Sequence, residues 1–334
     1  MKRFYKKGIS LFLILLMSFP LCACRSDDSK ALTTVKLNEV AHSIFYAPMY
    51  VAIEKGYFED EGIELSLTTG FGADKTMAAV VSGDADVGFM GTEASIYAYT
   101  EGAKDHVINF AQLTQRAGNF VVARENTESF SYEDMIGKDV LGGRAGGTPE
   151  MVYEYVLREN GVSPSEVKID QSIDFGSTAA AFSGGQGDYT IEFEPSATAL
   201  EQSGDGYVVA SIGVDSGYLP YTAFCAKESY LKENADLIQH FTNALQKGMD
   251  YVAGHSPEEI ASVIVPQFSE TDLKTLTLIV SRYYDQETWN TDLILREKGY
   301  DLMLTILEES GVLSGAAPYE DLVNTDFAEK ASTL

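Results

Sequence analysis

The stretch HSIFYAPMYVAIEKGYF, residues 42–58, lies between two segments in which apolar and polar residues alternate, TVKLNEV at 34–40 and IELSLTT at 63–69. Alternation of this kind predicts half-buried strands. Within the stretch, Pro48 suits the first turn of a helix and Gly56 suits a helix end. These residues are therefore expected to fold as strand, helix and strand.

The same alternation continues along the chain. Residues 73–83 predict a helix, residues 84–91 a strand, and residues 92–102 a helix that opens at Thr92. Strands that alternate with helices indicate an α/β fold built on a parallel sheet.

An internal similarity predicts a second copy of this arrangement. Residues 70–94 can be laid against residues 174–197, with Asp86 opposite Asp188. Matching residues that occur in the same order in both segments indicate two lobes of like topology. Chance similarity between two ordinary α/β units is the alternative, and it leaves two α/β units in place.

Two segments without helical periodicity, residues 106–125 and 206–229, are expected to carry the chain from the first lobe to the second and back. Helices are predicted after them, beginning with residues 234–254, whose apolar residues form one stripe. The C-terminal third is therefore expected to complete the first lobe.

The N-terminus has the pattern of an export signal. A basic start is followed by an apolar run at 9–19, which is too short to span a bilayer, and then by LCAC at 21–24. This ending resembles a bacterial lipoprotein box, which implies removal of residues 1–23 and lipidation of Cys24. A plain signal peptide with an incidental cysteine is the alternative. Residues 24–34 read as a polar tether.

Charge and cysteine content exclude several classes of protein. The formal net charge of −26 would become −30 after removal of residues 1–23, which hold four basic residues and no acidic one. Such an acidic surface repels nucleic acid and anionic lipid headgroups. Cys225 would be the one cysteine left besides Cys24, so neither an internal disulfide nor a cysteine metal cluster is expected. Cys225 reads as a small buried apolar residue.

The loops that follow the predicted strands are the expected place for a ligand. In open parallel sheets, ligands bind beyond the carboxyl ends of the strands, where loops enter helices. If the two lobes face each other, six such loops line one cleft. They are residues 42–48, 70–74, 89–93, 142–149, 174–178 and 191–195.

Residues 42–67 and the motif VVSGDADVGFMG at 80–91 resemble the opening of a known family, and the resemblance runs to APYEDLVNTDFAEKA at 317–331. The family comprises periplasmic or surface-anchored binding proteins that supply ATP-driven importers of nitrate, sulfonates, taurine or thiamine pyrimidine precursors. The implied fold class is α/β, a two-lobed periplasmic-binding-protein fold. Each lobe is a mixed sheet flanked by helices, and two crossover strands form the hinge.

The resemblance also implies domain limits and partners. Lobe 1 would comprise residues 35–118 and 222–334, and lobe 2 residues 119–221. The protein would be a monomer without a cofactor or metal, would bind no nucleic acid, and would deliver a small molecule to a membrane permease and its ATPase. It would be held by lipid at the extracytoplasmic face of the cell membrane.

The candidate site residues come from the six loops and from the two crossings, where residues 115–119 and 218–221 are expected to lie near the ligand. The candidate ligand-binding residues are His42, Phe45, Tyr46, Phe71, Gly91, Thr92, Glu93, Gln115, Arg144, Gly146, Gly147, Thr148, Asp174, Glu192, Glu194 and Tyr221.

Several of these residues have a structural alternative. Phe45 could pack beneath its loop, and Glu192, on a strand expected to be buried, could form a salt bridge. Glu93 and Glu194 could accept hydrogen bonds from helix N–H groups. The glycines of residues 142–147 could cradle an anion, with Arg144 assisting, or could form a flexible turn.

The candidates combine aromatic rings with more acids than bases, which favours a flat ligand that donates hydrogen bonds. A thiamine-related pyrimidine is the first expectation, and a taurine, sulfonate, nitrate or riboflavin-type ligand is the alternative. A buried carboxylate that faced a sulfonate would be left unpaired.

An enzyme is the rival class. A pyrimidine synthase of similar fold carries a cysteine-rich motif that is missing here, and the four histidines form no helical metal pair. The protein is therefore expected to bind its ligand without catalysing a reaction.

Overall fold

The computed structural model describes residues 31–127, 129–143, 145–173, 175–313 and 315–334. The predicted signal peptide, the predicted lipidation site Cys24 and most of the predicted tether lie outside the described residues. Arg144 and Asp174 lie outside them as well. No helix among the described residues is long and apolar enough to cross a membrane.

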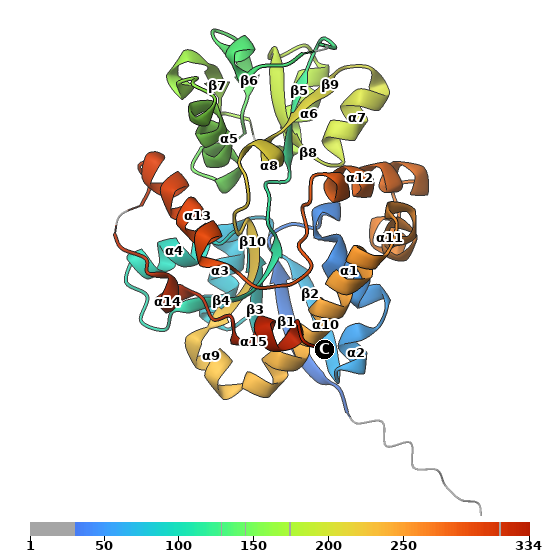
Figure 1. The fold of residues 1–334 in the computed structure, drawn as a ribbon, viewed down its shortest axis with the longest axis vertical. Coiled ribbons are helices and arrows are strands. Elements are labelled where there is room, and N and C mark those ends of the chain that lie inside the picture. Colours follow the sequence, from blue (N-terminus) through green and yellow to red (C-terminus); the bar gives the residue numbers. More distant parts are fainter. Residues whose placement is uncertain (1–30, 128, 144, 174, 314) are drawn as a thin grey trace, which may run out of the picture. The chain divides into compact units, whose positions relative to one another are not determined.

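The first sheet is mixed and has the strand order β2-β1-β3-β10-β4 (Figure 1). β1, β2 and β3 are parallel, and β10 runs antiparallel to both of its neighbours. The strands are β1 (Thr33–Glu39), β2 (Ile63–Thr69), β3 (Val87–Met90), β4 (Val107–Thr114) and β10 (Thr222–Lys227).

The second sheet has the order β7-β6-β8-β5-β9. Here β6, β7 and β8 are parallel, and β5 is antiparallel to β8 and β9. The strands are β5 (Asn119–Ala123), β6 (Asp139–Leu141), β7 (Lys168–Asp170), β8 (Tyr189–Phe193) and β9 (Tyr207–Ser211).

The two sheets repeat one topology, as the internal similarity predicted. In each, three parallel strands are followed by one antiparallel strand that has just crossed from the other sheet. The landmark aspartates are equivalent too: Asp86 Oδ2 accepts from Lys36 N at 2.9 Å, and Asp188 Oδ2 accepts from Asp139 N at 3.0 Å. The α/β fold with two mixed sheets is thus confirmed, while the exact lobe limits stay a prediction.

The helices lie on the faces of the sheets and at their ends. Those before β9 are η1 (Ile44–Tyr46), α1 (Ala47–Glu54), α2 (Tyr57–Asp60), α3 (Ala73–Ser82), α4 (Glu93–Thr100), η2 (Tyr132–Met135), α5 (Thr148–Glu159), η3 (Pro164–Glu166), α6 (Phe175–Ser183) and α7 (Ser196–Ser203). Those after β9 are α8 (Ile212–Asp215), α9 (Glu228–Glu233), α10 (Ala235–Gly254), α11 (Pro257–Ile264), η4 (Val265–Phe268), α12 (Leu273–Asp285), α13 (Glu297–Glu309), α14 (Tyr319–Leu322) and α15 (Asp326–Ala331).

Local signals in the sequence account for several helix ends. Pro48 occupies the first turn of α1, and Gly56, which follows α1, adopts the left-handed conformation with φ 72°. Ser256 and Glu259 form a reciprocal capping box at the start of α11. The apolar stripe of α10 is buried against α1, α2 and α15.

One large buried cluster runs through both sheets. Cys225 belongs to a smaller buried cluster beside β3, where its thiol is 1% exposed and burial raises its pKa to about 12. This fits the expected role of a small apolar residue.

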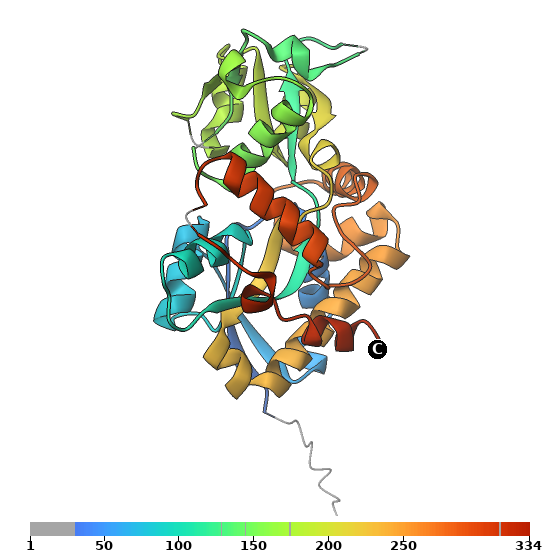
Figure 2. The same ribbon diagram turned by 60° about the vertical axis from the view of Figure 1, so that its left-hand side comes forward.

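The two connections between the sheets run side by side (Figures 1 and 2). Leu219 N donates to Gln115 O at 3.0 Å, and Tyr221 N donates to Thr114 O at 3.2 Å. Two crossing segments that bond to each other in this way form the predicted hinge geometry.

Candidate functional site

Phe45 lies where the two sheets meet. Ser43 caps the short helix η1, which places the Phe45 ring, 1% exposed, inward. The ring packs edge-on against Tyr221 at 5.7 Å and Phe193 at 6.4 Å, and is tilted against Tyr283 at 5.1 Å. Phe193 ends β8 of the second sheet, so Phe45 joins both halves of the molecule.

Glu93 is a buried acid beside these rings. It is the first residue of α4, and its carboxylate folds back over Gly91, where an added Cβ would lie 2.0 Å from Glu93 Oε2. Glu93 is 7% exposed, and Oε2 has no hydrogen-bond partner among the described residues. Burial raises the pKa of this carboxyl, and the Thr148 side chain, which lies close by without meeting hydrogen-bond geometry, opposes the rise.

Three more buried polar groups around Glu93 also lack partners within the described part of the chain. They are Thr148 Oγ1 at the start of α5, Asn119 Oδ1 at the start of β5, and the Tyr221 hydroxyl before β10. Burial, followed by the charges of neighbouring Tyr46 and Glu93, raises the pKa of Tyr221. We call Tyr46, Glu93, Asn119, Thr148 and Tyr221 the junction cluster.

The junction cluster draws on both sheets. Glu93 follows β3 of the first sheet, Thr148 follows β6 of the second, and Asn119 and Tyr221 lie on the two crossings. Asn119 Nδ2 donates to Pro149 O at 3.5 Å, next to Thr148. Unpaired buried polar atoms are rare in folded proteins and need an explanation. Four of them where the two sheets meet can be satisfied by a polar ligand.

His42 lies in a neighbouring network and not in the junction cluster. Its Nδ1 lies 3.0 Å from Glu39 Oε1, and its Nε2 lies 2.9 Å from Gln267 O. Tyr50 donates to Glu39 Oε2 at 2.6 Å. The bond to Glu39 raises the pKa of His42, with burial opposing it. Glu39 in turn adds to the raised pKa of Tyr46, so the network borders the cluster electrostatically.

Three other candidates lie at the margin of the cluster or away from it. Thr92 is buried, and its hydroxyl donates to Pro220 O on the second crossing. Phe71 is 76% exposed and holds a left-handed backbone with φ 55°. Gln115 donates to Glu287 O at 3.0 Å and faces a separate cavity. A ligand contact by any of these residues stays a prediction.

The glycine-rich loop before α5 already uses one of its N–H groups. Gly146 N donates to Glu150 Oε2 at 3.2 Å, and Gly147 caps the helix through its extended backbone. Burial raises the pKa of Glu150 to about 7. An anion bound at this loop would have to compete with the Glu150 carboxylate for the Gly146 N–H group.

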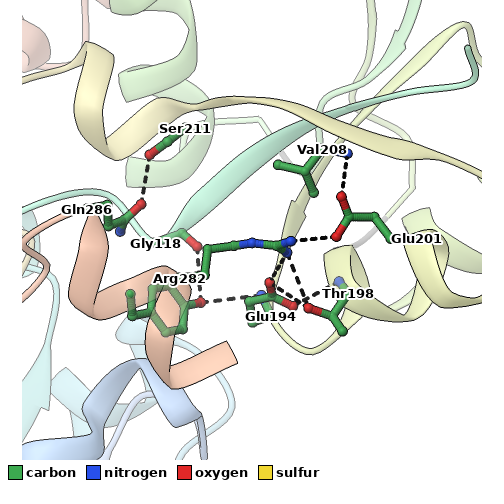
Figure 3. Close-up of polar contacts among 9 residues, drawn as sticks. Gly118, Glu194, Thr198, Glu201, Val208, Ser211, Arg282 and Gln286 are labelled. Atoms are coloured by element: carbon green, nitrogen blue, oxygen red, sulfur yellow. Dashed lines mark hydrogen bonds and ion pairs between the residues drawn. The ribbon is translucent and has the colours of Figure 1, made fainter. Parts of the chain in front are cut away.

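Glu194 takes part in a network that ties α12 to the second sheet (Figure 3). Its carboxylate forms an ion pair with Arg282 and accepts from Thr198 N and Thr198 Oγ1, both at 2.9 Å. Arg282 also pairs with Glu201. The structure therefore shows the helix-capping alternative for Glu194, with an ion pair added.

Glu192 is buried within β8 and has no cationic partner among the described residues. It is 1% exposed and accepts a hydrogen bond from Thr190 Oγ1 at 2.6 Å, and Thr178 also bonds to it. Burial raises its pKa to about 7. The charged form of Glu192 therefore opposes folding.

Replacing Glu192 with glutamine should stabilise the protein more at pH 8 than at pH 5. Because the folded-state pKa of about 7 lies above the ordinary glutamate value of 4.5, stability falls as the pH rises between these values. The shift sets an upper limit of about 3 kcal/mol on the gain above pH 7. Urea unfolding at both pH values measures it, with the exposed Glu59→Gln as control. Equal gains at both pH values would refute the assignment.

The first crossing was expected to place Asn119 near the ligand, but the sequence did not single out two other residues of this region. Phe193 sits between two glutamates, and Trp289 donates its indole N–H to Phe45 O at 2.9 Å across 244 positions of sequence. Nothing local indicates the partner of Trp289.

A family model described as NMT1/THI5 like matches residues 44–260 of the chain. YtlA of Bacillus subtilis (strain 168), which is named as a binding protein with no ligand in its name, is 43% identical over 334 residues, covering 100% of this chain and 99% of YtlA. The riboflavin-binding protein RibY of Chloroflexus aurantiacus is 27% identical over 244 residues, covering 71% of this chain and 66% of RibY.

Solved structures share the fold at lower identity. The periplasmic aliphatic sulphonate binding protein SsuA from Escherichia coli superposes with a TM-score of 0.70 at 16% identity, covering 86% of this chain and 96% of SsuA. Identity this low supports the fold alone.

Proposed function

The chain belongs to the NMT1/THI5-like family, and from that premise we propose that it is an extracytoplasmic solute-binding protein that holds a nitrogen heterocycle at the junction cluster and delivers it to an ATP-driven importer. The observation that carries the proposal is the set of four buried polar atoms without partners among the described residues. These atoms come from both sheets and both crossings.

The chemistry of the cluster favours a ligand that donates hydrogen bonds. Glu93 Oε2 and Asn119 Oδ1 are acceptors, and the hydroxyls of Thr148 and Tyr221 can accept or donate. The described residues supply no lysine or arginine to the cluster. An amino-substituted pyrimidine offers ring nitrogens, N–H groups and a flat face that the rings of Phe45 and Tyr46 can contact.

A thiamine-related pyrimidine is the ligand we favour. A flavin is the second candidate, because RibY is a related riboflavin-binding protein and because the site is lined by aromatic rings. A sulfonate is disfavoured, since it would place a second negative charge against the buried Glu93.

The delivery route is part of the proposal. The LCAC motif supports a lipid anchor on Cys24, and the family supports a permease and its ATPase as partners. In this scheme the ligand stabilises the closed arrangement over the open one. The size of that stabilisation equals the difference between its binding free energies for the two arrangements.

Thermal unfolding in the presence of a hydroxymethyl aminopyrimidine, riboflavin, taurine, methanesulfonate or nitrate tests the ligand class. We expect the pyrimidine, or failing that riboflavin, to raise the melting temperature. Glu93→Gln should then weaken binding about tenfold or more, because the amide replaces an acceptor with an N–H group.

Glu101→Gln, an exposed change at the other end of α4, is the matched control and should bind as the wild type does. Stabilisation by sulfonate or nitrate alone would overturn the ligand class. Wild-type affinity in Glu93→Gln would remove Glu93 from the site.

A further inference from the structure

A cavity of about 1010 Å³ lies beside the two crossings and apart from the junction cluster. Its lining includes Gln115 and Leu219 from the crossings and Leu302 from α13. Gln112 N of β4 donates to Leu293 O in the chain before α13 at 2.8 Å. Gly299 of α13 lies against Leu219 and Pro220 of the second crossing. Figure 1 shows α13 in the half of the molecule that contains the first sheet. A volume of this size is enough for a ligand of drug-like dimensions.

The aromatic lining of this cavity is concentrated on three residues. Trp289 is 9% exposed, while Tyr218 and Tyr284 are 50% and 37% exposed. The Arg116 guanidinium stacks on Tyr218 with its carbon 4.0 Å from the ring centre. Partly exposed aromatic side chains around a concave site favour a flat ring as ligand.

Of the two cationic residues that line the cavity, Arg296 and Lys298, one has no ion-pair partner among the described residues. Glu287 pairs with Arg116 at 3.2 Å, and Arg296 pairs with Asp292 at 2.7 Å. Lys298 makes no ion pair with any residue that the structure describes, although the chain as a whole is strongly acidic. An unpaired ammonium group beside aromatic rings favours a carboxylate on the ring.

We propose that this cavity, which we call the Trp289 cavity, is a second small-molecule site that takes an aromatic carboxylate. The ring lies among Trp289, Tyr218 and Tyr284, and Lys298 meets the carboxylate. This site goes beyond the proposed import function, because it differs from the junction cluster in position and in charge preference.

Trp289 stands between the two sites. It lines the cavity, and its indole N–H donates to Phe45 O, next to the junction cluster. It is also the one tryptophan in the chain. The indole N–H signal in a proton–nitrogen correlation spectrum is therefore a single, assigned reporter of the cavity.

The test titrates the protein with naphthoate and with naphthylmethanol, which has the same ring without the charge. We expect naphthoate to shift the Trp289 signal in a saturable manner and to bind at least tenfold more tightly than the alcohol. Lys298→Met should remove that preference. Equal binding of the two probes to the wild type, or no saturable shift, would overturn the proposal.

Two matched variants of α10 locate the binding. Ala253 is an exposed residue that lines the cavity, so Ala253→Phe should narrow the cavity and weaken naphthoate binding. Ala235→Phe, exposed at the other end of the same helix, should bind naphthoate as the wild type does. An unchanged titration in Ala253→Phe would show that naphthoate binds elsewhere.

Glu93→Gln separates this proposal from the import function. It alters the junction cluster alone, so naphthoate binding should be unchanged in it. Loss of naphthoate binding in Glu93→Gln would place the probe in the junction cluster and reject the second site, whereas failure of every solute in the import screen leaves the naphthoate result standing.

Discussion

Replacing Arg282 with methionine is expected to lower the free energy of unfolding by about 3–5 kcal/mol. The Arg282 side chain is 19% exposed and pairs with Glu194, whose side chain is 0% exposed. Removing the guanidinium leaves the Glu194 carboxylate buried without a cation, and the cost of that unpaired charge exceeds the value of the pair itself. Urea unfolding of the variant and the wild type measures the difference.

Arg158→Met is the matched control on the other side of the molecule. Arg158 pairs with Glu309 at 3.0 Å, but the two side chains are 27% and 38% exposed, so its loss should cost about 1 kcal/mol or less. Adding Glu194→Gln to Arg282→Met should recover part of the loss, because it neutralises the stranded charge. A cost for Arg282→Met no larger than that of Arg158→Met would show that the pair is not effectively buried.

Replacing Phe45 with alanine is expected to cost about 3–5 kcal/mol, the usual range for a fully buried phenylalanine. The ring contacts side chains from η1, β8, α12 and the second crossing, and an added Cβ on Gly118 would lie 2.8 Å from it. Such tight surroundings cannot collapse into the space that the ring leaves. Thermal and urea unfolding both report the loss.

Phe71→Ala provides the contrast within the same set of candidates. Phe71 is 76% exposed, so its truncation should change the free energy of unfolding by about 0.5 kcal/mol at most. If Phe45→Ala lowered the free energy of unfolding as little as Phe71→Ala, the close packing of Phe45 where the two sheets meet would be refuted.

Much of the fold is encoded in short stretches of sequence. The capping box at Ser256 and Glu259 and the buried stripe of α10 depend on residues a few positions apart, so their patterns were readable. The internal repeat could be predicted from the sequence because Asp86 and Asp188 make the same kind of backbone contact in the two sheets. The ion pair of Glu194 with Arg282, 88 positions away, has no such local signal.

The site was predictable as a set of loops and less so as individual contacts. Loops at the carboxyl ends of parallel strands in the two sheets meet, which brings Glu93 of the first sheet and Thr148 of the second toward each other as the sequence suggested. Glu192 and Glu194 sit in one such loop, yet one points into a strand layer and the other caps a helix. Side-chain direction within a loop depends on tertiary packing, which the sequence pattern does not contain. Ligand contact by these residues stays a prediction.

The order of the strands along the chain has a consequence for how the protein folds during translation. The second sheet takes its strands from one uninterrupted stretch, Asn119–Ser211, whereas the first needs β10, which leaves the ribosome more than a hundred residues after β4. The middle of the chain can therefore finish folding while β3 and β4 still have open edges on the side that β10 will fill. Open strand edges invite pairing with other chains. That interval is when the nascent protein is most prone to aggregate.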